Sequence, residues 1–306
     1  MILSLVNVKA IERSGLTPAI SIDHRFRRRA IGQNMIYTDD LQLSEYCFDE
    51  RRKSLFVTLT SHAYLDYTLN LIESVRRLGL SDYLLVFVLD IDGYNALLSK
   101  ASETGVHVIY YPNRYNLTGM QLFQQDRWHL VSFCKIEIVY RLLCLGHDVL
   151  FTDSDIVFLK DPREFLQNNI LRSDILIQDD SANLESSRSP AMTYLCMGFF
   201  YLKSSDKTVD VFKPRHWIFA RLAASLWRML QPHSKITITD QKHFNKYIKH
   251  RLDIGILPRD LFPNGFYYYN KDKIASDCYL IHFNYLVGDE KRKRMIEDGY
   301  YYLGTQ

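Results

Sequence analysis

Two aspartates near the middle of the chain, Asp153 and Asp155, lie between apolar runs at residues 149–151 and 156–159. In an extended chain, residues two apart point to the same side, about 6.6 Å apart along the strand. Paired carboxylates that emerge from a buried chain are costly unless positive charge lies between them. Hard oxygen ligands with open positions suit Mg²⁺ or Mn²⁺, especially a cation that also binds a substrate phosphate. The pair therefore indicates a metal–diphosphate site at the end of a core strand.

The D-x-D spacing alone is weak support, because a chain of this length contains roughly one such tripeptide by chance. A second one, Asp90-Ile91-Asp92, also follows an apolar run, at residues 84–89. Gly93 comes directly after it and favours a simple strand-to-turn interpretation there. The surrounding sequence must therefore distinguish the two.

The composition of the chain is typical of a globular protein with a sizeable core. Its 306 residues are 47% hydrophobic and 24% charged, and a net charge of +3 is too small to indicate a nucleic-acid partner. The cysteines are dispersed, without a C-x-x-C pair, which favours reduced thiols over a disulfide framework or a zinc site. They are Cys47, Cys134, Cys144, Cys196 and Cys278.

The first 52 residues form a poorly defined extension. Their apolar start lacks a basic region ahead of it and is a poor signal peptide. The chain also contains no run near the roughly 20 apolar residues of a membrane span. We therefore expect a cytoplasmic location, with the Golgi lumen as the alternative if an N-terminal anchor is missing. The basic cluster at residues 24–29 is interpreted as a solvated face.

The periodicity beyond residue 53 predicts a single α/β domain over residues 53–306. Apolar runs alternate with helical spacing, which indicates parallel strands joined by right-handed crossovers. The chain from Leu252 on is expected to be loop-rich. The predicted strands are 55–59, 84–89, 106–111, the one before Asp153, 174–178 and 197–203, and the predicted helices are 64–78, 94–102, 128–145, 206–230 and 241–249. Within 206–230, Pro214 must interrupt the helix or start a new segment.

Open α/β sheets bind ligands at the carboxyl ends of their strands. The predicted strand ends carry Thr58, Thr60 and Asp90, in addition to the central aspartate pair. A nucleotide held by these residues would lie beside a metal-bound diphosphate. For Asp90, hydrogen bonding to the base or ribose and capping of a turn are both open.

Five segments in a fixed order resemble the nucleotide-diphospho-sugar transferase family, which includes plant xylosyl- and arabinosyltransferases and protist galactosyltransferases. The resemblance extends roughly from Leu55 to Leu303. It implies a GT-A-like, Rossmann-type mixed sheet flanked by helices. It also implies a divalent cation, Mn²⁺ rather than Mg²⁺, and retaining transfer from a UDP-type nucleotide sugar to a glycan or glycoprotein. The segments are VLFTDSDIVFLKDP, MGFFYLKSS, DQKHFN, LFPNG and IHFNYLVGDEK.

The resemblance also implies roles for individual residues. Asp153, Asp155 and His282 would bind the metal, although His282 has apolar neighbours and could instead be a core histidine. Gly288 would allow close approach of the loop to the phosphates, and Lys291 would neutralise the leaving diphosphate, unless it is simply a surface lysine.

The same resemblance places a further set of residues around the donor sugar. Asp240 would orient hydroxyl groups and Gln241 would lie near the anomeric carbon, although Asp240 could also cap the helix that begins there. Lys135 would face the donor, with solvent exposure as the alternative. Cys196 occupies a position at which the family usually has asparagine, which leaves the donor sugar open.

Two other functions remain open at this stage. A nucleotidyltransferase acting on a sugar phosphate can share the topology and metal site, but the predicted loop LTSHAYLDY lacks the glycines of a phosphate loop. A non-catalytic glycan-binding relative is the other alternative, supported only by Cys196. Acceptor contacts are expected from the variable loops at residues 113–125 and 179–190.

Overall fold

The computed structural model describes residues 54–111, 128–185, 189–217, 239–271 and 277–304. Every described residue belongs to one compact unit, which lies within residues 37–306. The predicted N-terminal extension therefore lies outside the described residues.

The first half of the unit alternates strands and helices, as predicted. Asp90 caps the second helix, which begins at Ile91 rather than at residue 94, and Gly105 ends it with a φ of 72°. The Asp90 carboxylate accepts from the N–H of Gly93, one of the otherwise free donors of the first turn, which explains why the helix starts earlier than its apolar spacing suggests. The elements are β1 (Ser54–Thr60), α3 (Leu65–Arg77), β2 (Leu84–Val88), α4 (Ile91–Thr104) and β3 (His107–Tyr110).

The central part contains the strands that flank the aspartate pair. Helix α7 ends at Phe212 and helical structure resumes over residues 214–217, so the helical stretch predicted over 206–230, with its interruption at Pro214, is confirmed up to residue 217; residues 218–230 lie outside the described part. The elements are α5 (Trp128–Cys144), β4 (Asp148–Thr152), β5 (Ile156–Phe158), α6 (Arg163–Asn169), β6 (Ile175–Asp179), β7 (Leu195–Leu202) and α7 (Asp206–Phe212).

The C-terminal part is more regular than predicted. The helix predicted over 241–249 is a short α-helix that continues as a π-helical turn over Phe244–Ile248. The described residues of the expected loop-rich tail instead include two strands and two helices. Strands of three or four residues are too short for a hydrophobic period to reveal them. The elements are α9 (Asp240–His243), β8 (Ile254–Leu257), α10 (Gly265–Asn270), β9 (Leu280–His282) and α11 (Gly288–Glu297).

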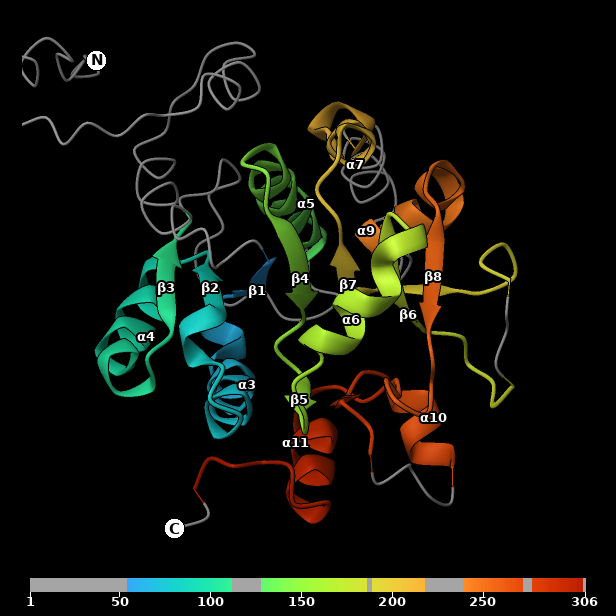
Figure 1. The fold of residues 1–306 in the computed structure, drawn as a ribbon. Helices are drawn as coiled ribbons and strands as arrows, with labels where there is room; N and C mark the ends of the chain where they lie inside the picture. The colour runs from blue at the N-terminus through green and yellow to red at the C-terminus, as the bar shows by residue number, and fades with distance from the viewer. Residues whose placement is uncertain (1–53, 112–127, 186–188, 218–238, 272–276, 305–306) are drawn as a thin grey trace, which may run out of the picture. The chain divides into compact units, whose positions relative to one another are not determined.

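The strands form a seven-stranded sheet in the order β3-β2-β1-β4-β7-β6-β8 (Figure 1). Strands β3, β2, β1 and β4 pair in parallel, whereas β7 is antiparallel to both β4 and β6. Strand β8 pairs in parallel with β6. The mixed sheet predicted from the sequence is therefore confirmed. A second, two-stranded sheet joins β5 and β9 in antiparallel pairing.

Both faces of the large sheet are buried beneath helices. Neighbouring residues of β1 alternate between them: Val57 packs on the side covered by α5 and α7, and Phe56 packs on the side covered by α3, α4 and α6. A third apolar cluster joins β5 and β9 to α11 through Val157, Ile281 and Met295. This cluster fixes the small sheet directly beyond the end of β4. Among the described residues, no helix has the length and apolar character needed to cross a membrane.

Candidate functional site

The aspartate pair lies in the connection between the two sheets. Strand β4 ends at Thr152 and β5 begins at Ile156, so the pair occupies the crossing point rather than one continuous strand. The backbone N–H of Asp153 donates to the carbonyl of Gly198 on β7, at 2.7 Å. The N–H of Phe283 donates to the carbonyl of Asp155, at 3.0 Å. The chain positions of both aspartates are thus set by the strands on either side.

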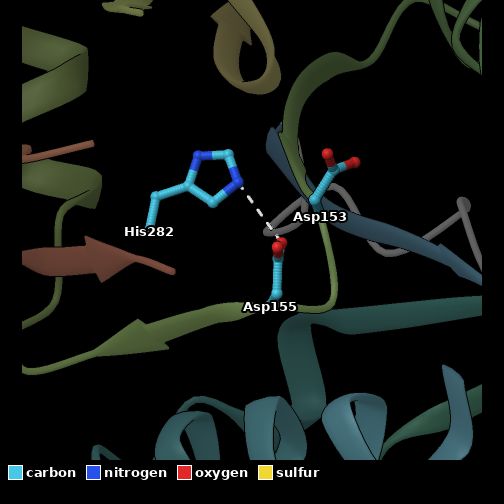
Figure 2. A group of neighbouring side chains, drawn as sticks. All are labelled: Asp153, Asp155 and His282. Carbon is cyan, nitrogen blue, oxygen red and sulfur yellow. Dashed lines mark ion pairs between the residues drawn. The ribbon is translucent and has the colours of Figure 1, made fainter. Parts of the chain in front are cut away.

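His282 lies at the end of β9, opposite Ile156 in the small sheet. Its Nε2 atom is 3.2 Å from Oδ1 of Asp155, and Figure 2 shows the ring pointing toward that carboxylate, with Asp153 on the adjoining chain. Asp153, Asp155 and His282 each offer one ligand atom, and these atoms lie within 4.8 Å of one another. Two carboxylates and an imidazole are a donor set that fits Mn²⁺. His282 is buried, so the two interpretations of this histidine, ligand and core residue, are compatible.

Gly198 is required by the crowding around these ligands. A Cβ atom at this position would lie 2.6 Å from Oδ2 of Asp153 and 2.7 Å from Cε1 of His282. Real Cβ contacts essentially never come so close, so any side chain would displace a ligand. The sequence shows Gly198 within the motif MGFFYLKSS, but only the structure indicates why glycine is needed there.

Lys135 on α5 connects the two halves of the site. Its Nζ atom lies 3.1 Å from Oδ1 of Asp153 and 3.2 Å from Oδ2 of Asp240. It also donates to the carbonyl of Met197, at 2.9 Å. Burial lowers the pKa of Lys135, but the two carboxylates outweigh burial and raise the pKa above its usual range. Lys135 is therefore a buried cation that faces the site and not solvent.

Lys291 supplies a second positive charge, on the other side of the aspartate pair. It lies on the first turns of α11 and forms an ion pair with Oδ2 of Asp155. Burial would raise the pKa of Asp155, but Lys291 and His282 outweigh it and hold the pKa well below its usual range. Lys291 is thus more than a surface lysine. Gly288, which begins α11 with a φ of 55°, accepts a hydrogen bond from the Tyr67 hydroxyl at its carbonyl, at 2.9 Å.

Asp240 does not cap its own helix. Thr239 is the N-cap of α9, and its side chain accepts from the N–H of Lys242. The carboxylate of Asp240 is instead buried against Lys135. Burial raises the pKa of Asp240, and the attraction of Lys135 opposes this rise. The capping interpretation of Asp240 is therefore wrong.

Gln241 is held at both ends of its carboxamide. Its Oε1 accepts from the N–H of Met197 at 3.1 Å, and its Nε2 donates to Oδ2 of Asp180 at 2.9 Å. The other oxygen of Asp180 accepts from the amides of Asn264, at 3.2 Å, and Asn284, at 2.7 Å. Burial raises the pKa of Asp180. Sequence reasoning missed this cluster of one carboxylate and three amides, although both asparagines stand inside the motifs LFPNG and IHFNYLVGDEK.

Of the residues predicted at the other strand ends, Thr60 and Asp90 have local structural partners, whereas the Thr58 hydroxyl is buried with no hydrogen-bond partner among the described residues. The Thr60 hydroxyl lies 2.6 Å from that of Thr68, and Thr58 is completely buried in β1. One oxygen of Asp90 accepts from the N–H of Gly93 and the other from the N–H of His62, both at 2.8 Å. Asp90 thus acts as a cap. Roles of these three residues in donor binding remain predictions.

Cys196 lies next to the candidate metal ligand. Its Sγ atom is 3.8 Å from Nδ1 of His282 and accepts from the N–H of Gly198 at 3.3 Å. Burial raises the pKa of the thiol well above its usual value. A neutral, buried thiol at this position adds no charge to the site.

Comparison with known proteins supports one family. The family described as nucleotide-diphospho-sugar transferase matches residues 79–295. A UDP-D-xylose:L-fucose alpha-1,3-D-xylosyltransferase of Arabidopsis thaliana is 23% identical over 270 residues, covering 82% of this chain and 67% of the relative. A UDP-galactose:fucoside alpha-3-galactosyltransferase of Dictyostelium discoideum is also 23% identical, over 81% of this chain and 43% of that relative.

A solved structure shows the same fold. The glycosyltransferase GlyE of Streptococcus pneumoniae superposes with a TM-score of 0.52 and 12% identity, covering 82% of this chain and 60% of that one. The predicted GT-A-like architecture is therefore confirmed. Because the family match covers more than half of the sequence, the chain belongs to the nucleotide-diphospho-sugar transferase family and is a glycosyltransferase that uses a nucleotide-sugar donor.

Proposed function

We propose that the protein transfers a sugar from a UDP-sugar to a glycan or glycoprotein, with a divalent cation and with retention of the anomeric configuration. The observation that carries this proposal is the convergence of Asp153, Asp155 and His282 within 4.8 Å, between two lysines. The three side chains would hold the cation, which supplies positive charge to the donor diphosphate when bound. Mn²⁺ suits the imidazole ligand better than Mg²⁺ does.

The lysines would assist departure of the nucleotide. Lys291 forms an ion pair with Asp155, so its ammonium group lies where the leaving diphosphate would develop charge. Its position on the first turns of α11 also places the positive end of that helix toward the same region. Lys135 is held by Asp153 and Asp240 and would support the donor sugar from the opposite side.

The contacts of Gln241 support a front-face mechanism for retention. A covalent intermediate would require its Oε1 to attack the anomeric carbon, yet this atom accepts from the N–H of Met197. Asp240 is engaged with Lys135. Attack by the acceptor hydroxyl on the face that the diphosphate leaves would need no protein nucleophile. Asp240 and Gln241 would then orient hydroxyl groups of the two sugars.

The relatives suggest which substrates to test first. Both names above specify UDP donors, fucose or fucoside acceptors and alpha linkages. Transfer from an α-linked donor to an α-linked product retains configuration. We therefore propose a fucoside as the first acceptor, with UDP-xylose and UDP-galactose as the first donors.

The loop after β6 is the part of the structure that we propose contacts the acceptor. Arg259 is buried and pairs with Asp179 at 2.8 Å. Its guanidinium donates to the carbonyls of Ser181, Asn183 and Glu185, which ties this loop beside Asp180. The other predicted acceptor loop, residues 113–125, lies outside the described residues.

The test combines donor binding and product analysis. Each UDP-sugar is scored by thermal shift with and without Mn²⁺. A matching donor should raise the free energy of unfolding of the protein by about 2.7 kcal/mol at a hundredfold excess over Kd. Transfer to a fucoside is then followed by NMR of the new linkage. An inverted product rejects retention, and transfer that survives Asp153→Ala with Asp155→Ala rejects the metal site.

A further inference from the structure

We propose that Gln178 is a positioning residue that holds a proton on Nδ1 of His282 and so leaves Nε2, which faces Asp155, as the ring nitrogen available to a metal ion. Gln178 lies on β6 and is completely buried. Its Oε1 atom is 2.8 Å from Nδ1 of His282. The proposal depends on the proposed function only for its consequence, which is the presentation of Nε2 to a metal ion.

The orientation of the Gln178 carboxamide follows from its other partners. Its Nε2 donates to two backbone carbonyls, those of Phe262 and Pro263, both at 3.1 Å. Carbonyl oxygens accept hydrogen bonds and cannot donate them. A reversed amide would place its oxygen against these two acceptors and lose both hydrogen bonds. The NH₂ group must therefore face residues 262 and 263, and the oxygen must face His282.

The tautomer of His282 follows from that orientation. The carboxamide oxygen of Gln178 is an acceptor only, so Nδ1 of His282 must carry the proton. Nε2 faces a second acceptor, the Asp155 carboxylate, so in the metal-free protein it can carry a proton as well; a metal ion that binds Nε2 would displace that proton, whereas Nδ1 would keep its own. Nε2 lies 3.2 Å from Oδ1 of Asp155, on the side of the aspartate pair. Histidine ligands of metal ions are commonly oriented in this way by an acceptor behind the ring.

A local irregularity of the sheet directs the Gln178 side chain. The register between β6 and β7 shifts between Ile177 and Gln178, which brings Gln178 opposite Cys196. A bulge bends the strand and re-aims the side chain that follows it. Cys196 is the other neighbour of Nδ1, but at 3.8 Å its thiol is the longer and weaker contact. Gln178 is thus the partner that determines the tautomer.

The acceptor behind His282 is the neutral amide of Gln178, and this affects the charge of the site. Metal-ligating histidines are often backed by a carboxylate, which would bring a further negative charge. The candidate ligands already include two carboxylates, balanced by Lys135 and Lys291. A neutral amide fixes the ring without adding charge to this balance.

A purely structural role for Gln178, as a strut between β6 and residues 262–263, is the alternative to be tested. Asn70 provides a matched control because it is also a completely buried amide with backbone partners. Its Nδ2 donates to the carbonyl of Tyr300 at 2.9 Å, and its Oδ1 accepts from the N–H of Tyr302 at 2.6 Å. The experiment compares the wild type, Gln178→Met and Asn70→Leu.

The first measurement is ¹⁵N NMR of histidine-labelled protein without metal, at a pH at which the imidazole is neutral. Every protein in this measurement carries Asp155→Ala, which removes the competing acceptor of Nε2, and the wild type here means this background alone. The His282 signals are assigned by their loss in His282→Gln. The wild type and Asn70→Leu should show a single tautomer with the proton on Nδ1, and Gln178→Met should show a mixture. A wild-type proton on Nε2 would overturn the proposal, even if no Gln178 variant folds.

The second measurement is the affinity for Mn²⁺ alone, by calorimetry. Gln178→Met should bind Mn²⁺ ~10- to 100-fold more weakly than the wild type, and Asn70→Leu should be unchanged although it is also destabilised. A folded Gln178→Met with wild-type affinity and an unchanged tautomer rejects the proposal. If the wild type binds no Mn²⁺, the proposed function fails, and the NMR result still decides the role of Gln178.

Discussion

Asp240 forms a buried ion pair with Lys135, with 3.2 Å between Oδ2 and Nζ, and the same lysine lies 3.1 Å from Asp153. The lysine thus links a candidate metal ligand on the β4–β5 connection to the acidic residue that begins α9. Donor diphosphate and donor sugar would contact opposite ends of this link. A change at Lys135 should therefore affect stability and donor binding together.

Replacement of Lys135 by methionine should destabilise the protein by about 3–5 kcal/mol, because Asp240 would remain buried without its cation. Adding Asp240→Asn should recover a substantial part of that loss, since no buried charge would be left unpaired. Chemical denaturation of the two variants measures both effects. Equal stability of Lys135→Met and the wild type would show that the ion pair between Lys135 and Asp240 contributes little to the free energy of unfolding.

Gly198→Ala should disrupt the site while leaving the fold in place. The added Cβ would lie 2.6 Å from Oδ2 of Asp153, so this carboxylate must move. We expect weaker Mn²⁺ binding and a loss of transfer of at least about tenfold, since displacement of a ligating group is costly. Gly79→Ala is the control, because its φ of 69° imposes strain but nothing lies within 4 Å of the added atom. If Gly198→Ala binds Mn²⁺ as tightly as Gly79→Ala does, the interpretation that Gly198 leaves room for the metal ligands is wrong.

Removal of the metal should lower the melting temperature, and Mn²⁺ should restore it. The stabilisation at saturating metal follows RT ln(1 + [L]/Kd), about 2.7 kcal/mol at a hundredfold excess. In Asp155→Asn, Mn²⁺ should no longer raise the melting temperature. The substitution replaces the carboxylate that lies between His282 and Lys291 with a weaker, neutral metal ligand. Asp92→Asn changes the exposed aspartate of the other D-x-D tripeptide and should keep the response. Thermal unfolding with EDTA and with Mn²⁺ tests the comparison.

Asp90→Ser should separate capping from donor binding. Serine is a good N-cap, so it should preserve most of the stability of α4, whereas Asp90→Ala should cost about 1 kcal/mol. If Asp90 also contacts the base or ribose, both variants should weaken nucleotide binding. Binding of UDP measured by calorimetry decides this point. Unchanged affinity in both variants leaves Asp90 with the capping role alone.

Local patterns were sufficient to predict much of the fold. The alternation of apolar runs and helical periods predicted β1, α3, β2, α5 and β4, because both faces of the sheet bury side chains at a regular spacing. Short elements such as β9, with three residues, carry no measurable period and were missed. The order of motifs also identified the three candidate metal ligands before their geometry was known.

The sequence by itself thus determined the fold class, the family and the residue types of the candidate metal–diphosphate site, since these depend on local spacing and on motif order. The tertiary structure alone decided how the site is held together. Gln178 and His282 are 104 residues apart, as are Asp180 and Asn284. The antiparallel insertion of β7 and the pairing of β5 with β9 bring such residues into contact. No local pattern reports these partners, because a hydrogen bond between distant residues depends on strand order and register, which nonlocal packing selects.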